Sequence, residues 1–148
     1  MAGATTPEFV IVPVSDGEVV GLGSWVYVWI DDDARAVYVG ATGVDPKTRV
    51  WLHLNDADPE IGRMRAAFQR LSTTDLEVIA MRVPDQVARA DVRDALGARL
   101  GEEGLLADDA ITDHLQLALA PSEETNGLVE RFVARMRSHL EPRDPALL

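Results

Sequence analysis

The sequence predicts an α+β fold in which a small, mainly antiparallel sheet of three strands is flanked by helices. Two short runs of β-branched and aromatic residues, 25–30 and 36–40, surround an acidic turn, a pattern typical of a β-hairpin. A third run of this kind, residues 76–83, is followed by segments with apolar residues at helical spacing. One hairpin, a separate strand and several helices together favour this fold class.

The composition is that of one ordinary folded domain. The chain has 148 residues, 47% of them hydrophobic and 26% charged, which is enough to bury a core. We predict a single domain over residues 1–148, with its core at about 25–105 and a helical extension at about 106–141. Because no run of eighteen apolar residues and no signal-like N-terminus is present, we expect no membrane contact and a cytoplasmic location.

Charge is strongly acidic overall but unevenly distributed. The net charge of -11 argues against a protein that coats nucleic acid, because phosphate binding depends on clustered Lys and Arg. Residues 61–100, with seven basic and five acidic side chains, form the only net basic third. Their arginines either form a local nucleic-acid footprint or are solvated charges on helix faces. The absence of cysteine excludes disulfides and thiolate metal sites.

The N-terminal part of the chain supplies the strands. Residues 9–14 form an apolar run that contains a proline, which favours an edge strand because proline lacks a ladder donor. If Asp32 and Asp33 are the central residues of the hairpin turn, Tyr27 stands directly opposite Tyr38. Side chains alternate between the faces of a strand, so both phenols then lie on one face.

Helix signals follow the hairpin. Asp45 and Pro46 form a good helix start, with an aspartate able to cap and a proline at the first helical position. Asp58 and Pro59 repeat this signal, and Gly101 is well placed to end the third helix. The apolar spacing predicts helices over residues 46–54, 59–71, 84–100, 110–119 and 128–140, with Asp108 or Asp109 capping the fourth and Asn126 the last.

Four polar side chains together suit a phosphodiester. Tyr27 and Tyr38 belong to the hairpin, whereas Arg49 and His53 lie four residues apart and share one face of the first helix. A guanidinium forms a planar fork that fits two phosphate oxygens. Each residue alone also has a plainer interpretation: sheet aromatics, a surface charge and an imidazole that decorates a helix.

A family resemblance rests on three pieces of sequence, which are Trp25-Val26-Tyr27, Tyr38-Val39-Gly40 and the pair Arg49 and His53. In this order they resemble the core of the GIY-YIG nuclease family, whose triplets are usually Gly-Ile-Tyr and Tyr-Ile-Gly. The resemblance implies a three-stranded sheet flanked by helices and metal-dependent hydrolysis of a nucleic-acid phosphodiester by an endonuclease. It implies that Tyr27 or Tyr38 helps to deprotonate water, that Arg49 binds the scissile phosphate and that His53 assists.

The resemblance also implies Mg2+ held by a glutamate on the third helix, and here the sequence departs from the family. Arg93 stands at the glutamate position, and a guanidinium cannot bind magnesium. Asp91 and Asp94 flank it, and either one reaches the ion only through altered helix geometry. Trp25 also replaces the first glycine.

Two functions therefore remain open. The first is a magnesium-dependent nuclease acting on DNA or RNA. The second is a catalytically degenerate copy of this fold that binds a phosphate-bearing ligand or a protein partner, with a homodimer also open. A third interpretation, a protein inhibitor or a DNA mimic, would rest on the excess of acidic residues.

Overall fold

Strands β3 (Ser24–Ile30) and β4 (Ala36–Thr42) form the predicted hairpin. The computed structural model describes residues 9, 11, 14–16, 18–19, 23–116 and 120–140. The hairpin turn is built around Asp31, whose carboxylate accepts hydrogen bonds from the backbone N–H groups of Asp33 and Arg35, both at 3.0 Å. A short acidic side chain thus replaces a backbone partner within the turn, and Ala34 adopts a positive φ of 62°.

The hairpin register differs from the predicted one by two residues. Tyr27 pairs with Gly40 and Trp29 pairs with Tyr38, because the turn is longer than a two-residue turn and the register shifts between Trp29 and Ile30. A slip of two residues leaves every side chain on its original face. Tyr27 and Tyr38 therefore still share a face, with ring centroids 6.2 Å apart and planes inclined by 22°.

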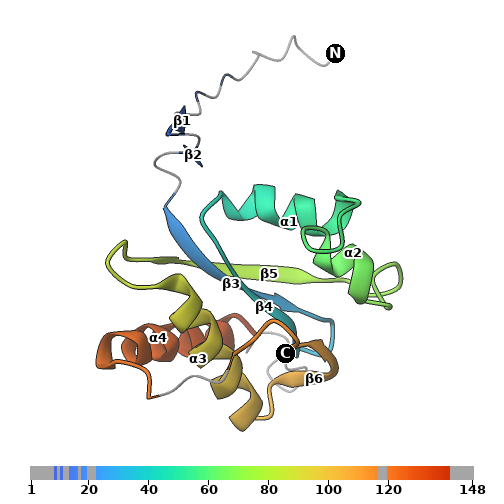
Figure 1. Cartoon of the computed structure of the whole chain (residues 1–148). Helices are drawn as coiled ribbons and strands as arrows, with labels where there is room; N and C mark the ends of the chain where they lie inside the picture. The colour runs from blue at the N-terminus through green and yellow to red at the C-terminus, as the bar shows by residue number, and fades with distance from the viewer. Residues whose placement is uncertain are drawn as a thin grey trace, which may run out of the picture.

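The main sheet has four strands in the order β5-β3-β4-β6 (Figure 1). Strand β5 (Glu77–Val83) is antiparallel to β3, and β6 (Leu106–Ile111) is parallel to β4. The α+β class with flanking helices is confirmed, but the prediction of a three-stranded, mainly antiparallel sheet is wrong in strand number, and the sheet is mixed.

Strand β6 occupies part of the sequence for which we predicted a helix over residues 110–119. Asp108 and Asp109 are exposed residues of the strand, so neither caps a helix there. Residues 112–116 are turn and irregular backbone, and residues 117–119 lie outside the described residues. Short, charged strands are typical of sheet edges, and such a segment lacks the apolar alternation by which strands are detected in a sequence.

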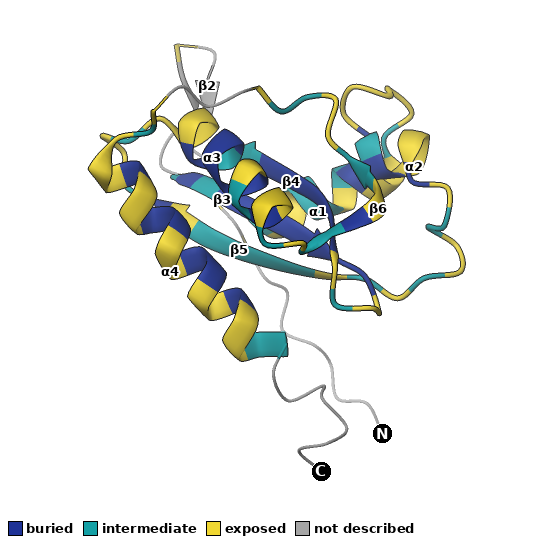
Figure 2. Ribbon diagram, turned by 90° about the horizontal axis from the view of Figure 1, so that it is seen from below, coloured by how far each residue is buried: buried dark blue, intermediate teal, exposed yellow. Residues whose placement is uncertain are grey.

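Two layers of helices enclose the sheet (Figure 1). Helices α1 (Pro46–Asn55) and α2 (Arg63–Ala67) cover the face that carries Tyr27 and Trp29. Helices α3 (Arg89–Glu102) and α4 (Glu123–Leu140) cover the other face, where their apolar residues pack on alternate residues of β3. Figure 2 shows the buried sides of α3 and α4 turned toward the sheet.

Helix boundaries agree with the sequence signals at α1 and differ elsewhere. The carboxylate of Asp45 accepts a hydrogen bond from Lys47 N at 2.8 Å, and Pro46 is the first helical residue. Helix α2 has only five residues, because residues 58–62 form a turn in which Ile61 N and Gly62 N both donate to Asp58 O. The second predicted helix, over residues 59–71, is therefore much shorter than expected.

The two later helices are also displaced from their predicted bounds. Residues 84–87 form a turn closed by Val87 N and Pro84 O at 3.0 Å, so α3 begins at Arg89. It runs past Gly101, and Gly104 takes the positive φ of 68° that ends such a helix. Helix α4 begins five residues earlier than predicted, where Thr125 N donates to Ser122 Oγ at 3.1 Å.

Of the N-terminal strand predicted over residues 9–14, residues 10, 12 and 13 lie outside the described residues, residues 9 and 11 are not in a strand, and Val14 begins a short strand. Val14–Ser15 (β1) and Glu18–Val19 (β2) pair as a separate two-stranded sheet. Among the described helices, none is both long and apolar enough to cross a membrane.

The Asp45 cap gives a first prediction. Asp45→Ala should lower the free energy of unfolding by about 1 kcal/mol, because a backbone N–H at the start of α1 loses its acceptor. Urea denaturation measures this change. Asp32→Ala is the matched control, since Asp32 is exposed and its carboxylate makes no hydrogen bond with the described residues. An equal loss in both variants would contradict the capping role.

Candidate functional site

The phenol of Tyr27 crosses over Gly40 on the neighbouring strand. A Cβ atom on residue 40 would lie 2.4 Å from Tyr27 Cζ and 2.5 Å from its hydroxyl oxygen, so a side chain here would collide with the ring. Tyr27 is 1% exposed, and its hydroxyl lies 2.7 Å from His53 Nε2 on α1. The absence of a side chain at Gly40 therefore leaves the space that the Tyr27 ring occupies.

His53 is fully buried between α1 and the sheet. The rings of Tyr38 and Trp29 meet its imidazole edge-on, with centroids at 4.8 and 5.5 Å. Burial lowers the pKa of His53 to about 3, and the nearby charges of Arg49 and Arg63 act in the same direction. His53 is therefore a neutral imidazole at physiological pH.

The hydrogen bond between His53 and Tyr27 has a preferred direction. His53 Nδ1 has no hydrogen-bond partner among the described residues. Buried N–H groups without a partner are rarer than acceptors without one, so we assign the imidazole hydrogen to Nε2, from which it is donated to the Tyr27 oxygen. The phenolic hydrogen of Tyr27 then remains free for another acceptor.

Tyr27 is a hydrogen-bond donor rather than a base in this environment. Burial, followed by the neighbouring Tyr38, raises the pKa of Tyr27 above its usual range, although the Arg49 guanidinium partly opposes the shift. The phenol therefore keeps its hydrogen at neutral pH.

A pocket of about 220 Å³ lies beside these rings. Strands β4 and β6 pair as far as Tyr38 and Ile111. Further along β4, Gly40 and Ala41 line the pocket. Its described lining consists of Tyr27, Tyr38, Gly40, Ala41, Arg49, Glu60, Arg63, Arg93 and His114. The pocket therefore joins the hairpin, three helices, and the turn that follows β6.

Three arginines reach the pocket from three helices. Arg49 of α1 donates to Ile61 O at 2.8 Å, Arg63 of α2 pairs with Asp113, and Arg93 of α3 donates through Nε to Asp94 Oδ1 at 2.9 Å. A guanidinium has five N–H donors, so each keeps donors for a ligand. Glu60 is the one carboxylate of the described lining, and Asp113 and Asp94 lie outside it as the partners of Arg63 and Arg93.

Sequence reasoning did not single out His114. Its Nε2 lies 2.6 Å from Val39 O, and its ring stacks on Tyr38 with centroids 4.4 Å apart and an angle of 11°. A carbonyl oxygen only accepts, so Nε2 carries the hydrogen and Nδ1 is the acceptor of the neutral ring. No sequence pattern indicates this contact, because it depends on the pairing of β6 with β4.

Arg63 and Glu60 were missed as well. Arg63 was one of seven arginines in the basic third of the chain, and its guanidinium carbon lies 5.9 Å from the Tyr38 ring centroid. Glu60 belongs to the turn before α2, where we predicted helix. Only the positions of α1 and α2 on the sheet bring these two residues to the pocket.

The structure brings some predicted residues together and leaves others aside. Tyr27, Tyr38 and Arg49 line the pocket, whereas His53 lies behind Tyr27. Neither of the two candidate magnesium ligands, Asp91 and Asp94, belongs to the described pocket lining. Asp94 is nearly buried, and its Oδ1 also accepts from Gln116 N at 3.2 Å; Asp91 is exposed in the first turn of α3.

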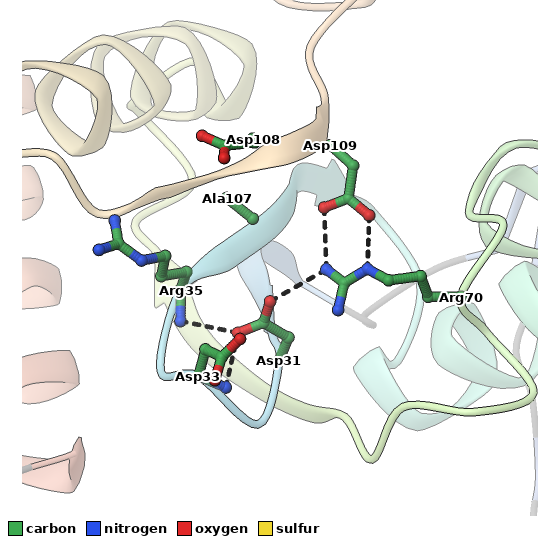
Figure 3. A pocket seen from close by; sticks show the side chains of 7 residues that line it. All are labelled: Asp31, Asp33, Arg35, Arg70, Ala107, Asp108 and Asp109. Atoms are coloured by element: carbon green, nitrogen blue, oxygen red, sulfur yellow. Dashed lines mark hydrogen bonds and ion pairs between the residues drawn. The ribbon is translucent and has the colours of Figure 1, made fainter.

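A second, more acidic pocket of about 490 Å³ lies at the hairpin turn (Figure 3). Arg70 forms a two-pronged ion pair with Asp109, at 2.6 and 2.8 Å, and also reaches Asp31 at 3.1 Å. Asp31, Asp32 and Asp33 are the only described group of three side chains close enough to share a metal ion. The Asp31 carboxylate already accepts three hydrogen bonds within the protein. The group of three aspartates is therefore explained by the structure of the turn.

Comparison with known proteins finds no relative: no family model, no curated protein and no solved structure matches this chain.

The close approach of Tyr27 to Gly40 gives a second prediction. Gly40→Ala should lower the free energy of unfolding by roughly 1–3 kcal/mol, because the added methyl group overpacks the space that the phenol occupies. Urea denaturation measures the change. Gly127→Ala on α4 is the control: beyond the adjoining helix backbone, no described atom lies within 4 Å of the position that its methyl group would take, so this change should be neutral or stabilising. Equal stability of the two variants would contradict the constraint.

The buried imidazole gives a third prediction. The folded pKa of His53, about 3, lies below the unfolded value of about 6.5, so the unfolded chain binds this proton first. His53 should therefore cost stability as the pH falls below about 6.5, at up to about 1.4 kcal/mol per pH unit. Denaturation midpoints between pH 7 and pH 4.5 measure the slope.

His53→Gln should flatten this slope. In NMR titrations the His53 ring signals should stay constant between pH 8 and pH 4.5. A midpoint near pH 6.5 for His53 would contradict its buried, neutral state.

Proposed function

We propose that this chain binds a phosphate-bearing ligand in the arginine-lined pocket without a metal ion. The observation that carries the proposal is the meeting of Arg49, Arg63 and Arg93 from three different helices around one pocket. Guanidinium groups bind phosphate oxygens through short, charge-assisted and often paired hydrogen bonds. The free hydroxyl hydrogen of Tyr27 adds a neutral donor to the same space.

Electrostatics supports the same function. A cleft of one charge sign concentrates ligands of the opposite sign, even on a protein whose overall charge opposes them. The three guanidinium groups of the described lining attract a single phosphate group, whereas the acidic remainder of the chain disfavours a long polyanion.

Arg93 is central to the proposal. In the GIY-YIG family, which the sequence resembles, a glutamate at this position holds magnesium. At position 93 a guanidinium provides positive charge directly, and its own side-chain partner is Asp94. We propose that the chain has a GIY-YIG-like fold in which this arginine replaces the metal centre, and that it binds its ligand in the cytoplasm.

A magnesium-dependent nuclease is the second candidate. The hydrogen bond between Tyr27 and His53, with Arg49 lining the same pocket, favours it. Hydrolysis would additionally require a deprotonated Tyr27, against the direction of its pKa shift, and a carboxylate that holds Mg2+. Glu60, Asp91 and Asp94 are the candidates for that ligand.

A fourth prediction separates the two candidates. Arg93→Gln should weaken binding of adenosine 5′-monophosphate by about 10- to 100-fold, because loss of a charge-assisted hydrogen bond costs about 1.5–3 kcal/mol. Isothermal titration calorimetry, with magnesium and with a chelator, measures the affinity. Binding by the unchanged protein should be equal under both conditions.

Arg135→Gln is the matched control, because Arg135 is exposed on α4 and is not among the described lining residues. Unchanged affinity in Arg93→Gln would contradict the proposed site. Magnesium-dependent cleavage of DNA or RNA that is lost in Asp94→Asn or Asp91→Asn would instead establish the nuclease.

A further inference from the structure

We infer that the pocket recognises a single terminal phosphate monoester on a small organic molecule, rather than an internal phosphodiester; this inference rests on the proposed function. Four features carry it: the charge of the pocket, the number of its donors, its size and the acidic loop at its rim.

Charge is the first feature. Three guanidinium groups face one carboxylate in the described lining, and two of them, Arg63 and Arg93, are each also paired with an aspartate, Asp113 and Asp94. A phosphate monoester carries about -1.5 to -2 at pH 7 and gains more from these guanidinium groups than a phosphodiester, which carries a single negative charge. Neutral His53 and protonated Tyr27 do not alter this balance at neutral pH.

The donors give the second feature. A monoester presents three terminal oxygens, whereas a diester presents two. Arg49, Arg63 and Arg93 approach from separate helices, so each can take a different oxygen. The Tyr27 hydroxyl, whose oxygen accepts from His53, supplies a further hydrogen.

Size and rim give the third and fourth features. Pockets for drug-sized ligands measure about 300–1,000 Å³, and this pocket of about 220 Å³ is suited to a phosphate group with its nearest atoms.

Glu60 lies at the rim in an exposed loop that also carries Asp56 and Asp58. The Glu60 carboxylate makes no ion pair with the described residues, so its negative charge faces any second phosphate of a diphosphate or polynucleotide.

A matched pair of nucleotides tests the inference. Adenosine 5′-monophosphate carries a monoester, and adenosine 3′,5′-cyclic monophosphate carries the same base and sugar with a diester. At pH 7.5 the full chain should bind the monoester at least about tenfold more tightly, which corresponds to about 1.4 kcal/mol, since one further charge lies close to several guanidinium groups. Isothermal titration calorimetry or NMR titration measures both affinities.

The pH dependence of this preference is a second readout. The second ionisation of a phosphate monoester has a pKa near 6, so the preference should shrink at pH 5.5. The pocket contains Glu60 and His114, whose Nδ1 lies 3.5 Å from Arg63 Nη2 and 3.7 Å from Asp113 Oδ1. Asp113 also pairs with Arg63, Asp94 pairs with Arg93, and His53 and the two tyrosines lie behind or beside these groups. The cyclic diester has no such ionisation and therefore reports any change of the protein itself over this pH range.

The rim gives a matched variant. Adenosine 5′-diphosphate should bind more weakly than the monophosphate, and Glu60→Gln should reduce this difference several-fold, because the change removes the negative charge that opposes the second phosphate. Asp32→Asn, at the hairpin turn and outside the described pocket lining, should leave the difference unchanged. Tighter binding of a 5′-phosphorylated oligonucleotide than of the monophosphate would overturn the small-molecule part of the inference.

The outcomes separate this inference from the proposed function. Equal affinities for the monoester and the cyclic diester, both lost in Arg93→Gln, would overturn monoester recognition and leave the phosphate site in place. Binding of neither nucleotide nor inorganic phosphate would overturn both. A pH-independent tenfold preference would show that something other than the second ionisation selects the monoester, and would also overturn the charge argument.

Discussion

The passage of the Tyr27 ring over Gly40 is the constraint on which the rest of the site depends. Because residue 40 has no side chain, the phenol crosses β4 and reaches His53 on α1. This contact fixes the height and rotation of α1 above the sheet, and Arg49, one helical turn earlier on the same face, is carried to the pocket. The buried imidazole costs stability in acid but positions the hydroxyl, so the hydrogen bond connects the strand pairing to the geometry of the pocket.

Local patterns predicted the elements whose stability is local. The hairpin and the start of α1 follow from β-branched runs and from the Asp45 cap, and Tyr27, Tyr38 and Arg49, which the sequence singled out, line one pocket. Strand β6 was missed because its stability comes from pairing with β4, and its acidic residues resemble a helix cap in sequence. Contacts made by tertiary packing alone, such as those of Arg63, Glu60 and His114, leave no periodic signal.

Opposite charges are sorted into two separate regions of the molecule. At the hairpin turn, Arg70 joins Asp31 of the turn to Asp109 of β6, so that a nearly buried carboxylate has the partner and hydrogen bonds that burial requires (Figure 3). At the other region, three arginines meet one carboxylate of the described lining, Glu60, and Arg63 and Arg93 are each paired with a further aspartate. Asp31 and Asp109 at the first region are satisfied within the protein, whereas arginines at the second retain N–H donors beyond those used internally.

The contact between His114 and Val39 has a consequence for association between chains. Beyond Tyr38, strand β4 extends past its last registered pair with β6, and a carbonyl there is a potential acceptor for a strand of another molecule. The His114 imidazole occupies the Val39 carbonyl at 2.6 Å and stacks across Tyr38, which blocks this part of the edge. A side chain from a turn thus protects the sheet against edge-to-edge aggregation, a task that charged residues, prolines or bulges perform in many other sheets.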